Sequence, residues 1–153
     1  MKHLHCVPEQ MVIDGTSPLV KSPNPETPES FALAQKLAKE VDADLILGSD
    51  PDADRVAIQV KGKDGAYVQI SGNQTGVLLL DYLIGAKKRA GTLPDRPVAL
   101  KSLVTTDLAR VVAEANGVES YNTFTGFKFM AEKKNQLEPA GQGHVIFSYE
   151  ESI

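Results

Sequence analysis

The alternation of short apolar runs with amphipathic stretches constrains the fold of this chain more than any other feature. From residue 27 of the 153-residue chain onward, the apolar runs resemble strands, and most stretches between them have helical spacing. The expected strands are 45–48, 56–60, 67–70, 97–103, 119–123 and 144–147. The expected helices are 28–41, 73–90, 107–116 and 126–137. This order is typical of α/β proteins with mixed, mainly parallel sheets and flanking helices.

A polar, glycine-containing turn separates two blocks of this pattern. We place a boundary near residues 64–67, which gives domains 1–66 and 67–153. The first thirty residues hold five prolines and leave room for little more than a short strand at 3–7. The sequence also stops soon after its last strand. We therefore expect two incomplete domains, whose uncovered strand edges and apolar faces favour self-association.

Composition narrows the classes of function. Twenty acidic and sixteen basic residues give a formal charge of −4, which argues against a nucleic-acid partner. No apolar run approaches the roughly 20 residues that a membrane-spanning helix needs, so we expect no membrane partner. Cys6 is the only cysteine, which excludes an internal disulfide and favours a reducing, cytoplasmic location.

Three aspartates at alternate positions, Asp50, Asp52 and Asp54, lie between two expected strands. Converging carboxylates repel one another unless a hard cation neutralises them, so this loop predicts a magnesium, manganese or calcium site. Arg55 follows immediately, and its guanidinium can bind a phosphate oxygen beside such a metal. An EF-hand is excluded because Arg55 and Lys61 stand where glycine and glutamate are required. A solvated acidic turn remains the alternative.

Three segments, in order along the chain, resemble the α-D-phosphohexomutase superfamily of phosphoglucomutases and phosphomannomutases. The sequence DPDADR at 50–55 resembles the magnesium loop of that superfamily. TGFKF at 125–129 resembles the threonine-glycine loop of its third domain, and EES at 150–152 resembles the start of its sugar-recognition loop. SPNPE at 22–26 and GNQ at 72–74 support the match. The resemblance spans the later part of domain 2 and most of domain 3.

The resemblance implies an enzyme that interconverts sugar 1-phosphate and 6-phosphate through a bisphosphorylated intermediate, with Mg²⁺ as cofactor. It implies that Asp50, Asp52 and Asp54 are the metal ligands. It further assigns catalytic roles to Arg55, which would contact the transferring phosphate, and to Lys101. The implied substrate-binding residues are Thr125, Gly126, Lys128, Glu150 and Ser152. The implied partners are a phosphorylated sugar and the remaining domains of the parent enzyme.

Departures from the family pattern limit what this chain does alone. The sequence contains no serine followed by histidine, asparagine and proline, and no phosphate-gripping loop rich in arginine, serine, glycine and threonine. We therefore expect the isolated chain to be inactive. Phe127 stands where the phosphomannomutase branch has histidine, which favours glucose or pentose phosphates. The alternative function is a non-catalytic α/β module that binds a divalent metal or a sugar phosphate.

Overall fold

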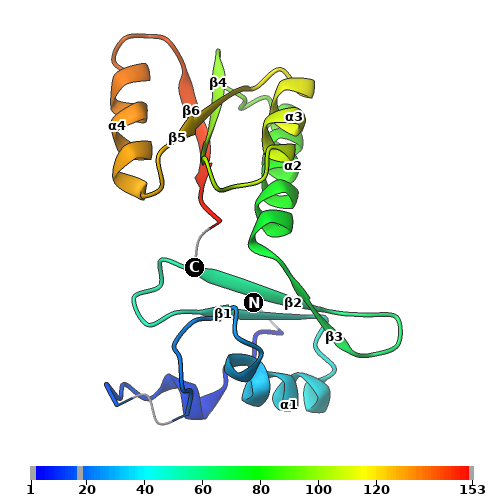
Figure 1. Ribbon diagram of the computed structural model, residues 1–153. Coiled ribbons are helices and arrows are strands. Elements are labelled where there is room, and N and C mark those ends of the chain that lie inside the picture. The colour runs from blue at the N-terminus through cyan, green and yellow to red at the C-terminus, as the bar shows by residue number, and fades with distance from the viewer. Residues whose placement is uncertain (1–2, 17–18, 152–153) are drawn as a thin grey trace. The chain divides into compact units, whose positions relative to one another are not determined.

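The computed structural model describes residues 3–16 and 19–151, and the chain forms two compact units (Figure 1). Unit 1 comprises Met1–Ser71 and unit 2 comprises Gly72–Ile153. The division falls after Ser71, beyond the boundary expected after residue 66. The reason is that β3 (Tyr67–Ile70) pairs with β2 (Val56–Lys61) and so belongs to the first unit.

Unit 1 is built on an antiparallel sheet of order β1-β2-β3, with β1 at Leu45–Ser49. Leu47 lies opposite Ile58, and Ile58 lies opposite Ile70. The turn between β2 and β3 closes through a 2.7 Å hydrogen bond from the Gly62 N–H to the Ala66 carbonyl. The mainly parallel arrangement expected from the sequence therefore does not hold in this unit.

One face of this sheet carries the core of unit 1. Two 3₁₀ turns, η1 (Pro8–Met11) and η2 (Pro28–Phe31), precede helix α1 (Ala32–Val41). The core cluster is formed by Phe31, Ala38, Ile46 and Ala57. Gly48 lets the Phe31 ring lie close to β1, because a Cβ at Gly48 would be 3.0 Å from Phe31 Cζ. Residues 3–7 form no strand and do not pair with any strand of the sheet.

Unit 2 is a three-layered α/β unit with a parallel sheet of order β5-β4-β6. Its strands are β4 (Pro97–Ser102), β5 (Glu119–Thr123) and β6 (His144–Tyr149). Helices α2 (Gly72–Ala90) and α3 (Leu108–Ala115) cover one face, and α4 (Phe127–Leu137) covers the other (Figure 1). The mixed α/β class expected from the sequence is thus confirmed, with the parallel sheet in unit 2.

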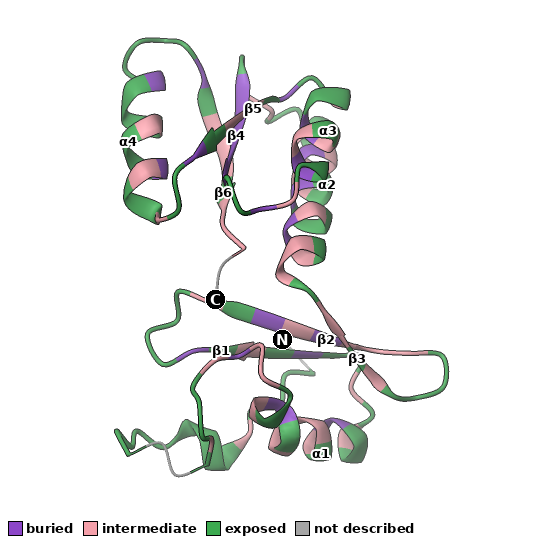
Figure 2. Ribbon diagram, viewed as in Figure 1, coloured by how far each residue is buried: buried purple, intermediate pink, exposed green. Residues whose placement is uncertain are grey.

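The central strand β4 is buried along its whole length (Figure 2). Its side chains alternate between two cores, since successive residues of a strand point to opposite faces. Ala99 packs with Leu80, Ile84 and Val118 beneath α2 and α3, whereas Val98 and Leu100 pack with Met130 and Leu137 of α4. Parallel pairing brings the carboxyl ends of all three strands to one edge, where α/β proteins commonly bind ligands.

None of the helices formed by the described residues is both long and apolar enough to cross a membrane.

Candidate metal loop and sugar-binding edge

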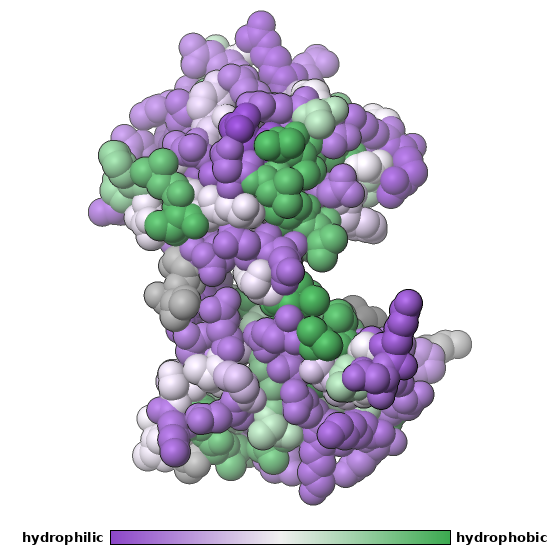
Figure 3. Space-filling model, turned by 45° about the vertical axis from the view of Figure 1, so that its right-hand side comes forward, coloured by the Kyte–Doolittle hydropathy of each residue, from purple (hydrophilic) through white to green (hydrophobic). Residues whose placement is uncertain are grey.

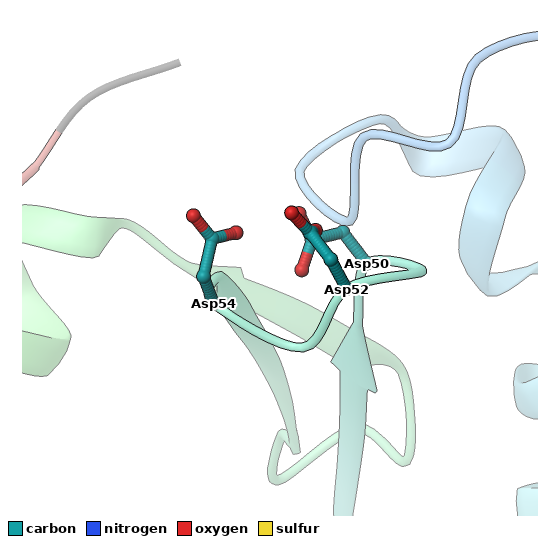
Figure 4. Close-up of side chains that lie close together, drawn as sticks. All are labelled: Asp50, Asp52 and Asp54. Atoms are coloured by element: carbon teal, nitrogen blue, oxygen red, sulfur yellow. The ribbon is translucent and has the colours of Figure 1, made fainter.

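The loop between β1 and β2 gathers three carboxylates. One carboxylate oxygen from each of Asp50, Asp52 and Asp54 lies within 4.8 Å of the others. Figure 4 shows all three side chains pointing to the same side of the loop. Asp50 is buried, while Asp52 and Asp54 are exposed. Ala53 adopts a left-handed backbone conformation, with φ at 59°, and this bend helps the flanking aspartates converge.

Arg55 holds the buried member of this cluster. Its backbone N–H donates to Asp50 Oδ1 at 3.0 Å, and its Nε donates to Asp50 Oδ2 at 2.7 Å. The Asp50 side chain has no exposed surface, whereas the Arg55 side chain is 40% exposed. The guanidinium therefore fixes the carboxylate and still lies at the surface, where it can meet a second anion.

The pKa values of the loop reflect crowded negative charge. Burial acts to raise the pKa of Asp50, but the hydrogen bonds from the Arg55 backbone and guanidinium outweigh it and hold that pKa well below its usual range. The pKa of Asp54 is raised, first by its hydrogen bond with Asp50, then by burial and by the charge of Asp52. The loop thus contains an ionised buried carboxylate beside one that resists ionisation, an arrangement that a cation would relieve.

The donor set fits a hard divalent cation. Three oxygens within 4.8 Å of one another need only small side-chain movements to gather around one ion with Mg–O bonds of about 2.1 Å. Each carboxylate oxygen has two lone pairs, so Asp50 can accept from Arg55 and still offer a lone pair to a metal. All the donors are oxygens, as magnesium prefers.

Unit 2 places Lys101, Gly126 and Glu150 at the carboxyl edge of its sheet. Lys101, near the end of β4, is only 3% exposed, and its Nζ donates to the Thr105 carbonyl at 3.1 Å. Asp107 Oδ1 lies 3.9 Å from the same Nζ. A lysine buried with so few acceptors differs from an ordinary surface lysine, because charge is expensive to bury without partners.

The two expected sugar-binding segments are joined by a direct hydrogen bond. The backbone N–H of Gly126 donates to Glu150 Oε2 at 2.7 Å. Gly126 has φ at 121°, a conformation that side chains disfavour, and it immediately precedes α4. Thr125 is exposed beside it. The threonine-glycine loop and the glutamate therefore lie together, as expected for parts of one site.

The remaining expected residues are less closely tied to this edge. Lys128 is exposed, and its Nζ lies 4.9 Å from the centre of the Phe129 ring, a cation–π contact. Ser152 lies outside the described residues. A shallow depression of about 420 Å³ between the end of β5 and α4 is lined by none of the expected residues; Leu103, Thr123, Phe124 and Phe129 are among those that line it.

Three residues at the edge of unit 2 were not singled out by sequence reasoning. Thr105 bonds to both Lys101 and the Glu151 backbone, and Asp107 lies near Lys101. Asn73 Oδ1 accepts the Thr106 N–H at 2.7 Å, which ties the start of α2 to the loop after β4. Asn73 belonged to a segment that supported the resemblance, but threonines in a loop carry no distinct sequence signal.

Comparison with known proteins gives the family of this chain. Residues 1–63 match the family model "Phosphoglucomutase/phosphomannomutase, alpha/beta/alpha domain II", and residues 71–153 match domain III of the same family. The chain therefore belongs to the phosphoglucomutase/phosphomannomutase family.

Curated relatives include a phosphoglucomutase of Staphylococcus epidermidis RP62A, 38% identical over 95% of this chain and 26% of the relative. A phosphoglucomutase of Staphylococcus aureus USA300 is also 38% identical, over 87% of this chain and 23% of its own length. The chain thus spans about a quarter of the length of these relatives.

Solved structures share the fold. A Thermus thermophilus protein described as a phosphomannomutase superposes with a TM-score of 0.61 at 21% identity, over 86% of this chain and 26% of that one. The N-acetylphosphoglucosamine mutase of Aspergillus fumigatus gives a TM-score of 0.53 at 14% identity, over 71% of this chain and 19% of that one.

Proposed function

We propose that this chain supplies the metal-binding loop and the sugar-recognition edge of an enzyme that interconverts sugar 1-phosphate and 6-phosphate. The reaction would pass through a bisphosphorylated sugar, with the phosphoryl donor outside this sequence. The observation that carries the proposal is the convergence of Asp50, Asp52 and Asp54, in a chain whose relatives are phosphoglucomutases.

Each unit contributes residues of a different kind. In unit 1, the three aspartates would hold Mg²⁺, which supplies charge neutralisation at a phosphate when bound. Arg55, already fixed by Asp50, would bind an oxygen of the transferring phosphate.

In unit 2, Lys101 would place a positive charge near the phosphate, and Glu150 would accept hydrogen bonds from sugar hydroxyls. Thr125, Gly126 and Lys128 would complete the sugar-binding surface. Ser152, which directly follows the Glu150–Glu151 segment in the sequence, would add a hydroxyl.

The proposed setting follows from the same sequence features. The substrate is a phosphorylated sugar, with glucose or pentose phosphates favoured by Phe127, and the protein partners are the further domains of a full-length mutase. We propose a cytoplasmic location, because the single cysteine suits a reducing compartment. We also propose that the protein has neither a nucleic-acid nor a membrane partner.

A metal titration tests the proposal most directly. Calorimetric titration with Mg²⁺ and Mn²⁺ should show binding to the chain, and Asp52→Asn should abolish it. Asp44→Asn, which removes an exposed charge elsewhere in unit 1, is the matched control and should bind like the natural chain. Absence of binding in a chain shown by circular dichroism to be folded would contradict a metal site assembled within these residues.

The second candidate function is a module that binds a metal or a sugar phosphate without turnover. The observation in its favour is that Asp50, Asp52 and Asp54 converge within one loop of unit 1, so that metal binding needs no other part of the site. Metal binding is expected under both functions. Mutase activity in the chain combined with the missing domains separates them, because only the first function predicts that activity.

A further inference from the structure

Thr105 lies in the loop that follows β4 and is almost fully buried, at 3% exposure. Its backbone N–H donates to the Ser102 carbonyl at 3.1 Å, and the two side-chain hydroxyls lie 2.9 Å apart. The neighbours Leu103 and Val104 are exposed. The loop therefore turns its threonine inward, onto the end of β4, and its apolar residues outward.

The carbonyl of Thr105 sets the position of a buried charge. It accepts a hydrogen bond from Lys101 Nζ at 3.1 Å, and the Lys101 side chain is only 4% exposed. An ammonium group carries three donors and no acceptor, so its direction inside a protein depends on the acceptors around it. The Thr105 carbonyl, together with Asp107 Oδ1 at 3.9 Å, thus sets where the Lys101 charge lies.

The hydroxyl of Thr105 reaches a different segment. Its Oγ1 accepts the backbone N–H of Glu151 at 3.0 Å. Glu151 directly follows Glu150, whose carboxylate accepts the Gly126 N–H. Lys101 lies opposite Tyr149 in the parallel pairing of β4 with β6. The hydrogen bond between Glu151 and Thr105 therefore joins the ends of two neighbouring strands.

We propose that Thr105 is a positioning residue that fixes Lys101 through its carbonyl and the Glu150–Glu151 backbone through its hydroxyl. A single residue thereby sets the relation between a cation and the carboxylate that binds the sugar. The inference rests on the proposed function, which assigns Lys101 and Glu150 to the sugar phosphate. The link to Glu151 requires the Thr105 hydroxyl in particular, because a methyl group cannot accept a hydrogen bond from the Glu151 N–H.

The test compares Thr105→Val, which keeps the shape and removes the acceptor, with Thr105→Ser, which keeps the acceptor. Thr106→Val is the matched control, because among the described residues the Thr106 hydroxyl accepts only the Leu108 N–H, at 3.3 Å. The readouts are the chemical shift and hydrogen exchange of the Glu151 amide by NMR, and the affinity for glucose 1,6-bisphosphate by calorimetry.

We expect Thr105→Val to shift the Glu151 amide resonance, to speed its exchange about fivefold to tenfold, and to weaken bisphosphate binding by a similar factor. Thr105→Ser and Thr106→Val should behave like the natural chain in all three measurements. An unchanged Glu151 amide in Thr105→Val overturns the proposed link. A changed amide with unchanged bisphosphate affinity overturns the positioning role.

Two further outcomes remain decisive. If the natural chain does not bind bisphosphate, the proposed function fails for this chain, while the Glu151 amide still decides whether Thr105 holds the backbone. If Thr105→Val does not fold, the natural chain and Thr105→Ser are compared. A Glu151 amide that is protected from hydrogen exchange in both proteins supports the link between Thr105 and Glu151. A Glu151 amide that exchanges freely in the folded natural chain overturns it.

Discussion

At the scale of single residues, Gly76 of α2 lies directly against the ring of Tyr149 of β6. A Cβ built at Gly76 would overlap that ring, so the glycine is required by close packing rather than by its backbone conformation. The ring cannot move away freely, because it stacks on Phe147 with the ring centres 5.2 Å apart. Tyr149 immediately precedes Glu150, so this contact supports the end of β6 from which the proposed sugar-binding segment continues.

We predict that Gly76→Ala lowers the free energy of unfolding of the chain by about 1–3 kcal/mol, the cost of overpacking a core. Gly85→Ala, in the same helix, should raise it by about 0.5–1 kcal/mol, because its Cβ would meet only the flexible end of Arg89. Urea unfolding followed by circular dichroism measures both. Equal effects of the two substitutions would contradict the packing role of Gly76.

Tyr149 makes the stability of the chain sensitive to alkaline pH. Burial raises the pKa of its phenol to about 12, from an ordinary value of about 10. Below about pH 10 the phenol is protonated in both the folded and unfolded states. Between about pH 10 and 12 the unfolded state loses this proton first, so the free energy of unfolding falls as pH rises.

Tyr149→Phe should remove this alkaline loss. The Tyr149 hydroxyl has no hydrogen-bond partner among the described residues, so the substitution should leave stability at pH 7 unchanged or slightly higher. Thermal unfolding from pH 7 to 11.5 measures the difference, with exposed Tyr82→Phe as control. A decline with pH as steep in Tyr149→Phe as in the natural chain would show that another group is responsible.

At the scale of elements, the face of the unit 1 sheet opposite its core has no covering helix among the described residues of unit 1. Four side chains on this face are between 47% and 62% exposed: Leu45 and Leu47 of β1, Val56 of β2 and Val68 of β3. Pairing places Ile58, Val60 and Ile70 on the same face. Hydrophobic side chains are visible at the surface in Figure 3. A contiguous apolar sheet face of this kind favours association with another surface.

We predict that the chain self-associates through this face, with a second copy of itself as the occupant. Light scattering after size-exclusion chromatography should show a mass that rises with protein concentration. Leu47→Lys places a charge on this face, in the edge strand β1, and should shift the chain toward monomer. Ile13→Lys, at an exposed position in the loop after η1, should not. A monomer at all concentrations would contradict self-association.

Local patterns predicted most elements well. The expected bounds of strands 67–70 and 119–123 equal the observed ones. The last residue of each of the other four strands differs from the expected one by one or two positions. The helix expected from residue 28 begins instead as a 3₁₀ turn. There, the Thr27 hydroxyl donates to the Asn24 carbonyl rather than capping a helix. Such local hydrogen bonds compete with regular helix geometry and leave no periodic signal.

Pairing between elements was harder to infer. A short polar turn between two apolar runs fits both a hairpin and a domain boundary, and the observed pairing of β3 with β2 is that of a hairpin. At the site, alternate spacing correctly brought the aspartates together. The burial of Asp50 depends on Arg55 folding back onto it, and the Thr105 hydroxyl reaches Glu151, which is 46 residues away in sequence. Such contacts are set by tertiary packing, which spacing does not encode.

At the scale of the whole molecule, the two units hold complementary kinds of group, and the sequence has no serine followed by histidine, asparagine and proline. The carboxylates and Arg55 belong to unit 1, and Lys101 and Glu150 belong to unit 2. We predict that the isolated chain does not convert glucose 1-phosphate to glucose 6-phosphate, even with glucose 1,6-bisphosphate present. A dehydrogenase-coupled assay measures this, with a full-length phosphoglucomutase as the positive control. Turnover that disappears in Asp52→Asn would contradict the prediction.

The position of β4 at the centre of its sheet affects the order in which unit 2 is made. The strand emerges from the ribosome well before β6, because the residues between Ser102 and His144 must be added first. At about 5–20 residues per second, those residues take roughly 2–8 seconds. During that interval one edge of β4 has no strand to pair with. The segment proposed to recognise the sugar, which directly follows β6, is therefore made after β4 and β5, and mispairing of the open β4 edge would displace the strand from which it continues.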